Sequence, residues 1–159
     1  MRVRILLLVA LLALAVPAAT SAKQGRSKNH GGSSQNHGGS SQIVGTWNAQ
    51  VMVNGQPTFP ALLTFSPGGG VVETESDAPG TGLGSWEKIG HRQYQLAFET
   101  FIFNNAGQPG GDVIVRMQAT VNGDTASGSF KFDVFDPSGK VVQSGAGTAT
   151  ATRFQIPPF

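Results

Sequence analysis

Apolar and polar residues alternate along the chain from Ile43 onward, and the alternation has a period of two. In DVIVRMQATV, residues 112–121, every second side chain is apolar, and Ile114 is the one apolar residue on the polar face. This period is typical of β-strands that bury one face, whereas an amphipathic helix repeats every 3.6 residues. No window of about a dozen residues has the helical period. The pattern therefore predicts an all-β domain over residues 43–159.

Clusters of glycine, proline, asparagine and aspartate interrupt the alternating runs at short intervals. Asn54-Gly55 and Asn122-Gly123 are typical of tight hairpin turns. The clusters divide the domain into eight predicted strands, which span residues 43–53, 59–65, 71–77, 84–89, 93–103, 112–121, 125–135 and 141–153. Because a short loop joins each strand to the next, we expect an antiparallel meander.

Eight meandering strands can close into a barrel or fold into two stacked sheets. Closure removes the exposed sheet edges. The strands at 93–103, 112–121 and 125–135 each have one apolar and one polar face, as a small barrel requires. A sandwich would share this pattern. We predict an eight-stranded antiparallel up-and-down β-barrel and keep the sandwich as the alternative.

The last predicted strand has a face of small residues. Gly145, Gly147, Ala149 and Ala151 share one parity, and mostly threonines occupy the other. If the small face points inward, it leaves space beside the bulky strands that precede it. That space would be either an apolar cavity or the place where bulky neighbouring side chains pack.

The two ends of the predicted domain carry a known pattern. Gly45-Thr46-Trp47 opens the first strand, and Arg153 ends the last. Here the chain resembles the calycins, which include lipocalins, fatty-acid-binding proteins and avidins, and more broadly small bacterial lipocalin-like domains. In lipocalins the tryptophan of a Gly-x-Trp closes the bottom of the barrel, and an arginine packs across its ring. The resemblance implies structural roles for Gly45, Trp47 and Arg153, since a guanidinium can stack on an indole.

The chain also departs from these families. It has no predicted helix beside the barrel and no cysteine, and Trp86 is the only further tryptophan, whereas avidins line the biotin site with several. Allene oxide cyclase and related barrel cyclases are similar in architecture alone. The resemblance implies non-covalent binding of a small hydrophobic molecule inside the barrel, with affinity from apolar burial and orientation from a polar group such as Tyr94. The expected lining residues are Val51, Leu63, Phe65, Trp86, Tyr94, Leu96, Phe98, Val115, Met117, Phe130 and Phe132.

The chain begins with the parts of a secretory signal over residues 1–22. Arg2 and Arg4 precede an apolar run from residue 5 to residue 16, and Thr20-Ser21-Ala22 offers small residues for cleavage. The run of roughly 12 residues is short for a bilayer span. We expect cleavage, a secreted or periplasmic protein and no membrane span afterwards; an uncleaved anchor is the alternative.

Residues 23–42 contain the unit NHGGSSQ twice in succession and no large apolar side chain. Such a segment cannot bury enough surface to offset its ordering entropy, so we predict a disordered, flexible tether. His30 and His37 could bind a transition metal weakly, but the pair lacks a third ligand. We therefore expect a spacer and no metal site.

Charge and cysteine content exclude several classes of function. From residue 43 onward the domain has six basic and nine acidic residues, a net charge of about −3. It has no basic stripe of the kind that nucleic-acid-binding domains present, so we expect no nucleic-acid partner. The absence of cysteine excludes thiol catalysis and cysteine-ligated zinc. No cofactor and no particular oligomeric state is predicted.

The domain has no convincing catalytic set, so we lean against an enzyme. His91 lies in a predicted turn, and Glu73 and Glu75 share a face of a short strand, where we expect them to be solvated. Glu99 and Arg116 are expected to form an ion pair across two strands on the outside. No hydrolase triad, phosphate-binding loop or metal-ligand spacing is present.

Two other functions remain open. The first is a small barrel cyclase or isomerase that confines a hydrophobic substrate, with Tyr94 or Glu99 assisting. The second is a cell-envelope interaction module without a ligand, whose apolar patch would contain Phe101, Phe103, Phe135 and the terminal residues 156–159.

Overall fold

The computed structural model describes residues 42–76, 78 and 80–159. The predicted signal at 1–22 and all but the last residue of the predicted tether at 23–42 lie outside the described residues. The described chain forms eight strands and no helix, so it contains no helix that could cross a membrane. The strands are β1 (Gly45–Val53), β2 (Phe59–Phe65), β3 (Gly70–Glu75), β4 (Thr81–Gly90), β5 (Gln93–Phe103), β6 (Pro109–Asn122), β7 (Thr125–Phe135) and β8 (Val141–Arg153).

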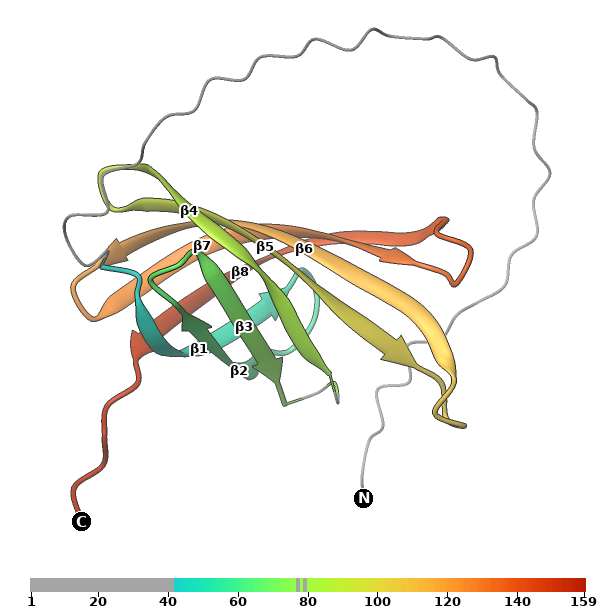
Figure 1. The fold of residues 1–159 in the computed structure, drawn as a ribbon, viewed down its shortest axis with the longest axis horizontal. Helices are drawn as coiled ribbons and strands as arrows, with labels where there is room; N and C mark the ends of the chain where they lie inside the picture. Colours follow the sequence, from blue (N-terminus) through green and yellow to red (C-terminus); the bar gives the residue numbers. More distant parts are fainter. Residues whose placement is uncertain (1–41, 77, 79) are drawn as a thin grey trace, which may run out of the picture. The chain divides into compact units, whose positions relative to one another are not determined.

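The strands form a closed antiparallel barrel in the order of the sequence (Figure 1). Each strand pairs with the next, and β8 pairs with β1 from Trp47↔Arg153 to Val53↔Gly147. This last pairing confirms the predicted up-and-down barrel and excludes the two-sheet alternative. Two strands begin three residues earlier than predicted, β4 at Thr81 and β6 at Pro109.

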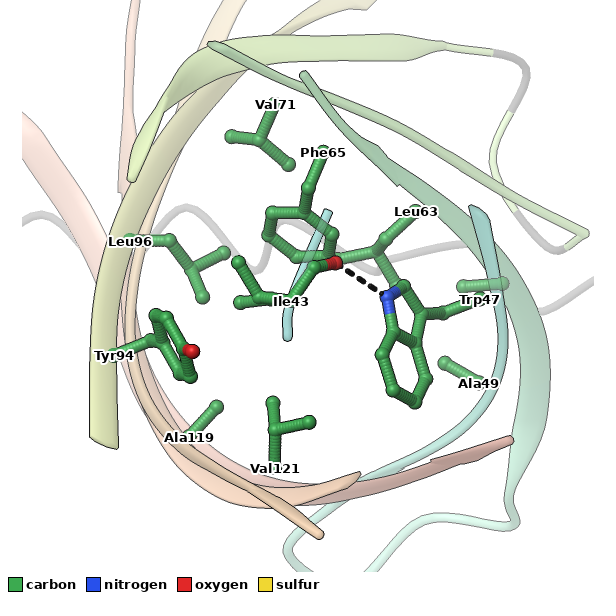
Figure 2. Close-up of a cluster of buried hydrophobic side chains, with 11 residues drawn as sticks. Ile43, Trp47, Ala49, Leu63, Phe65, Val71, Tyr94, Leu96, Ala119 and Val121 are labelled. Atoms are coloured by element: carbon green, nitrogen blue, oxygen red, sulfur yellow. Dashed lines mark hydrogen bonds between the residues drawn. The ribbon is translucent and has the colours of Figure 1, made fainter. Parts of the chain in front are cut away.

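The chain before β1 folds across one end of the barrel instead of extending the strand as predicted. Gly45 has a φ of +118°, which a side chain rarely allows, and this conformation turns the chain away from the strand direction. Ile43 is 2% exposed and lies in the middle of the ring of inward side chains, as Figure 2 shows. The Trp47 Nε1 donates a hydrogen bond of 2.8 Å to the carbonyl of Ile43. We call this end of the barrel the closed end.

Arg153 holds the folded-back segment in place. Its guanidinium carbon lies 4.2 Å from the centre of the Trp47 ring. Nη1 and Nη2 donate to the carbonyls of Val44 and Gln42 at 2.8 and 2.6 Å, and Nε contacts Asp124 at 3.1 Å. A Cβ on residue 45 would lie 2.8 Å from Arg153 Nη1, so the glycine also makes room for the guanidinium.

At the opposite end, β5–β8 extend beyond the shorter strands β1–β3 (Figure 1). The pairing of β8 with β1 stops at Gly147, whereas its pairing with β7 continues to Val141. We call this part the overhang; it consists of residues 100–103, 109–113, 131–135 and 141–146. Because β1, β2 and β3 end before the overhang does, they do not enclose it, and we call this end of the barrel the open end.

The small face of β8 points inward, and aromatic rings of β7 pack over it. A Cβ on Gly145 would collide with the ring of Phe132, and one on Gly147 with the ring of Phe130 and the carbonyl of Met52. Bulky neighbours thus use the space beside these two glycines, which is one of the two outcomes the sequence left open. The glycines let the two rings lie close to the barrel wall.

Candidate ligand-binding site at the open end

The predicted lining residues divide between the two ends of the barrel. Five of them pack near the closed end against Ile43 and Trp47 or against one another, and these are Leu63, Phe65, Trp86, Tyr94 and Leu96. The other six lie toward the middle and the open end, and these are Val51, Phe98, Val115, Met117, Phe130 and Phe132. In the second group, Val51, Phe98 and Met117 still pack against the core that contains Ile43 and Trp47, whereas Val115 and Phe132 lie beyond it and are partly exposed.

Trp86 and Tyr94 are part of the closed-end packing. The Trp86 ring makes edge-to-face contacts with Phe65 and Tyr94, at centroid distances of 6.4 and 5.9 Å. Its Nε1 donates to the carbonyl of Ser66 at 3.0 Å. Tyr94 is 1% exposed and projects from β5 into the ring of core side chains (Figure 2). Both aromatic residues are therefore held in the core of the closed end.

Partly exposed apolar side chains face inward at the open end. They are Phe98 and Ile102 on β5, Val113 and Val115 on β6, and Phe132 on β7, and we call these five residues the inner patch. The register Phe98↔Val115 and Val115↔Phe132 places three of them side by side across β5, β6 and β7. Val113 and Ile102 follow on the same faces of β6 and β5, closer to the end of the overhang. Ile102 and Val113 were not among the predicted lining residues, because the sequence does not show how far the overhang extends.

The inner patch is the largest difference between the two ends of the barrel. At the closed end, the inward side chains of Trp47, Val71, Tyr94 and Val121 have almost no exposed surface. At the open end, the five side chains of the inner patch keep part of their surface accessible, although Val134 on the same face of β7 is buried. Apolar surface that the protein leaves uncovered on a concave face is the kind that ligand sites use.

Glu73 lies in the middle of β3 and points inward, contrary to the prediction that it is solvated. It is 4% exposed, and among the described residues it is the one charged side chain that is buried. The register places it between Leu63 on β2 and Gly82 on β4, and Glu75 on the same face is partly buried. The physical reason is strand parity: the pattern of β3 begins with two valines, so either face could have been the apolar one.

Three groups converge over Gly82, close to Glu73. A Cβ on this glycine would lie 2.6 Å from a ring carbon of Phe98, 2.8 Å from Thr100 Oγ1 and 3.1 Å from Glu73 Oε2. The missing side chain therefore allows Phe98 and Thr100 of β5 and Glu73 of β3 to pack closely over the backbone of Gly82. The pair of glycines at 82 and 84 on β4, opposite a strand with an inward carboxyl, is the sequence signal that could have revealed this arrangement.

The other acid–base candidates lie on the outside or in turns. His91 is exposed in the turn between β4 and β5. Glu99 is exposed on the outer face of β5, so it cannot assist a reaction inside the barrel. The expected pairing of Glu99 with Arg116 is wrong, because Arg116 Nη1 contacts Asp133 at 2.7 Å instead. The described residues contain no group of three or more side chains suited to a metal ion.

Asp133 is held by two donors on the outer face. Ser144 Oγ donates to Oδ1 at 2.6 Å, and Arg116 donates to Oδ2 at 2.7 Å. These hydrogen bonds stabilise the ionised form and lower the pKa of Asp133 below its ordinary value of 3.8. The network ties β6, β7 and β8 together and has no access to the interior.

Two shallow hollows lie on the outer surface of the barrel, with volumes of about 580 and 520 Å³. Their walls are mostly outward threonine, serine, asparagine and glutamine side chains of β1 and β5–β8, such as Gln50, Thr120, Ser127 and Thr150. Such walls combine neutral hydrogen-bonding groups with apolar surface of threonine and alanine, and both hollows are wide open to solvent. The inner patch, next to a buried carboxyl, is the stronger candidate for a ligand site.

Comparison of the chain with models of protein families, with curated proteins and with solved structures found no match.

Proposed function

We propose that this domain binds a small hydrophobic molecule non-covalently at the inner patch, inside the open end of the barrel. The observation that carries the proposal is the contrast between the two ends. Ile43, Trp47 and Arg153 seal one end, while Phe98, Val115 and Phe132 keep accessible apolar surface at the other. A ligand entering from the open end would cover this surface, and its burial would supply the affinity.

The predicted signal and tether fit this proposal. A ligand-binding domain that is exported, and released or tethered outside the cytoplasm, would meet small apolar molecules that diffuse through the envelope or the medium. The calycin resemblance supports the same assignment, since the Trp47–Arg153 contact is the feature that it implies.

Two opposite faces of one strand provide the test. Phe98 lies on the inner face of β5 and Phe101 on its outer face, where it is 65% exposed. We would titrate the protein and its Phe98→Ala and Phe101→Ala variants with the uncharged fluorescent probe N-phenyl-1-naphthylamine. Loss of the Phe98 ring should weaken binding about tenfold, the equivalent of roughly 1.4 kcal/mol, and loss of the Phe101 ring should not.

The same titration separates this proposal from its rivals. Circular dichroism of each variant establishes that the barrel is folded. Equal effects of the two variants, or no probe binding by the folded protein, would reject the inner patch as a ligand site. Native mass spectrometry of protein purified gently from its own host adds a second readout, because a bound molecule adds a mass that denaturation removes.

The outer face of the overhang favours a second candidate function, the binding of another envelope component. Phe101 and Phe103 are 65% and 57% exposed there, and Val141 and Val142 are also exposed. The pairing Phe101↔Asp112 and Asp112↔Phe135 aligns the β7 phenylalanine with this surface. An apolar patch on a sheet face is typical of interaction surfaces. If Phe101→Ala abolishes retention on isolated envelopes while probe binding is intact, this second function holds as well.

A further inference from the structure

The overhang leaves part of β8 without a neighbouring strand on one side. β8 pairs with β7 from Val141 onward, but its pairing with β1 begins only at Gly147. The turn after β1 covers one more position, because the Asn54 N–H donates to the carbonyl of Ala146 at 3.1 Å. Among the described residues, no strand pairs with residues 141–145 on that side. We call these residues the free edge; at the rise of a β-strand they span about 17 Å.

Backbone groups of the free edge point away from β7. In an antiparallel sheet, successive residues direct their N–H and C=O groups to alternate sides of the strand. The Ala146 carbonyl points toward β1, so Ser144, two residues earlier, directs its N–H and C=O to the same side. The register with β7 passes over Val142, which has no partner on that strand. The free edge therefore offers backbone donors and acceptors at Ser144 and Val142.

The free edge has few of the features that protect sheet edges from pairing. Proteins commonly place charged residues, proline or a bulge on such an edge. The segment VVQSGAG, residues 141–147, contains no charged residue and no proline. Val141 and Val142 are 46% and 53% exposed, and β-branched residues favour strand pairing. The bulge at Val142 is the protective feature that the segment has, and it limits regular pairing to a short stretch.

A second copy of the chain fits this edge. Two identical edges in antiparallel orientation are self-complementary about a two-fold axis, because each donor of one copy meets an acceptor of the other. The contact places no like charges opposite each other, since the segment is uncharged. We propose that two copies associate through their free edges, paired antiparallel about a two-fold axis at Gln143. Ser144 of each copy then lies opposite Val142 of the other, and the two residues exchange backbone hydrogen bonds.

This pairing joins the two overhangs into one sheet. A two-fold axis perpendicular to the sheet keeps both inner faces on the same side, so the two inner patches lie on one continuous surface. Each free edge is used once, and the association therefore stops at the dimer. A contact as short as the free edge is typical of weak, reversible complexes. The dimer requires no ligand and so goes beyond the proposed function.

Light scattering over a range of protein concentrations tests the pairing. We would measure the average mass from about 1 μM to about 1 mM, the range in which weak complexes form. Ser144→Pro removes the N–H that points to the free side, and Ser144→Ala is its matched control. Both variants lose the hydroxyl that binds Asp133, but the alanine keeps the N–H. The mass should rise toward that of a dimer for the unmodified protein and Ser144→Ala, and Ser144→Pro should weaken the dimer about tenfold or more.

Charge substitutions at Gln143 test the register. On the two-fold axis this residue lies opposite its own copy, so Gln143→Lys or Gln143→Glu alone places like charges together and should dissociate the dimer. An equal mixture of the two variants pairs opposite charges and should associate again. Gln118→Lys is the control, because it makes the same change at an exposed position on the outer face of β6 and should leave the association intact. Circular dichroism establishes that each variant is folded.

Each outcome decides one part of the proposal. A protein that stays monomeric up to about 1 mM, or a folded Ser144→Pro variant that associates as strongly as Ser144→Ala, overturns pairing through the free edge. A mixture of the Gln143 variants that stays monomeric overturns the two-fold axis at Gln143. If Ser144→Pro does not fold, the Gln143 variants and their mixture still decide the question. None of these measurements uses a ligand, so their failure leaves the proposed binding at the inner patch to its own test.

Discussion

Replacement of Arg153 by lysine should open the closed end of the barrel without changing its charge. The guanidinium lies 4.2 Å from the Trp47 ring centre and bridges the carbonyls of Val44 and Gln42 at 2.8 and 2.6 Å. It also contacts Asp124 at 3.1 Å. A lysine ammonium could reach one of these acceptors but has no planar fork to bridge them and no flat surface to stack on the indole.

The size of the effect follows from these contacts. A hydrogen bond to a charged group contributes about 1.5–3 kcal/mol when it is well formed, and a partly exposed cation–π contact about 0.5–1 kcal/mol. Because lysine restores part of one bond and the bond to Gln42 is exposed, we expect Arg153→Lys to lower the free energy of unfolding by about 2 kcal/mol. For a domain of this size the melting temperature would fall by about 8 °C.

Arg116→Lys is the matched control for this experiment. It is the same chemical change in an arginine whose side chain is half exposed and pairs with Asp133 on the outer face. Exposed ion pairs contribute about 0–1 kcal/mol, so the control should cost less than about 0.5 kcal/mol. The comparison separates the geometry of the closed end from the general effect of exchanging arginine for lysine.

The assay is urea unfolding followed by far-ultraviolet circular dichroism, with equal m-values required for comparison. A double-mutant cycle with Trp47→Phe isolates the stacking term, and we expect a coupling energy of about 0.5–1.5 kcal/mol between the two side chains. If Arg153→Lys is no more destabilising than Arg116→Lys, or if the two closed-end substitutions are additive, Arg153 does not hold the segment before β1 in place.

Three further predictions concern Ile43 in the segment before β1, the small inward face of β8, and the hydrogen bonds that Arg116 and Ser144 donate to Asp133. Ile43→Ala should lower the free energy of unfolding in urea by about 2–4 kcal/mol, as for other buried core residues. A decrease below about 0.5 kcal/mol would show that this segment does not close the end of the barrel. Gly147→Ala should destabilise by about 1–3 kcal/mol and more than Gly145→Ala, because the new methyl group meets a backbone carbonyl of β1 at residue 147 but only a ring at residue 145; equal melting temperatures would contradict this. The lowered pKa of Asp133 stabilises the fold above about pH 4, and this contribution is lost as the pH falls through the folded-state pKa. Asp133→Asn should therefore flatten the dependence of the unfolding free energy on pH below about pH 4. An unchanged slope would mean that Arg116 and Ser144 do not hold the carboxylate in solution.

Local pattern alone determined the strands and their order in the barrel. Alternation with a period of two marked each strand, and glycine- and asparagine-rich turns ended it, so the eight predicted strands agree with β1–β8 to within a few residues. Both signals act between residues close in the chain, and they require no knowledge of distant contacts. Closure was only favoured at this level, because the pairing of β1 with β8 joins the two ends of the domain.

Side-chain environments depended on parity and register, which local sequence specifies weakly. Val71 and Val72 are adjacent, so the apolar face of β3 had two assignments, and the one that buries Glu73 follows from the pairing of β3 with β2 and β4. Arg116 has a carboxylate on either neighbouring strand, Glu99 and Asp133. Ser144 on β8 binds one oxygen of Asp133 and leaves the other directed at the arginine.

The sequence by itself determined an all-β meander with one apolar face per strand, because turn chemistry and a period of two are local properties of the chain. Only the tertiary structure decided which end of the barrel is sealed and what the open end presents. Those features arise where residues far apart in sequence meet: Ile43 under Trp47 and Arg153 at one end, and Glu73 beside Phe98 at the other. Their positions depend on strand register and on glycines that admit a neighbour, and both are set when the barrel closes.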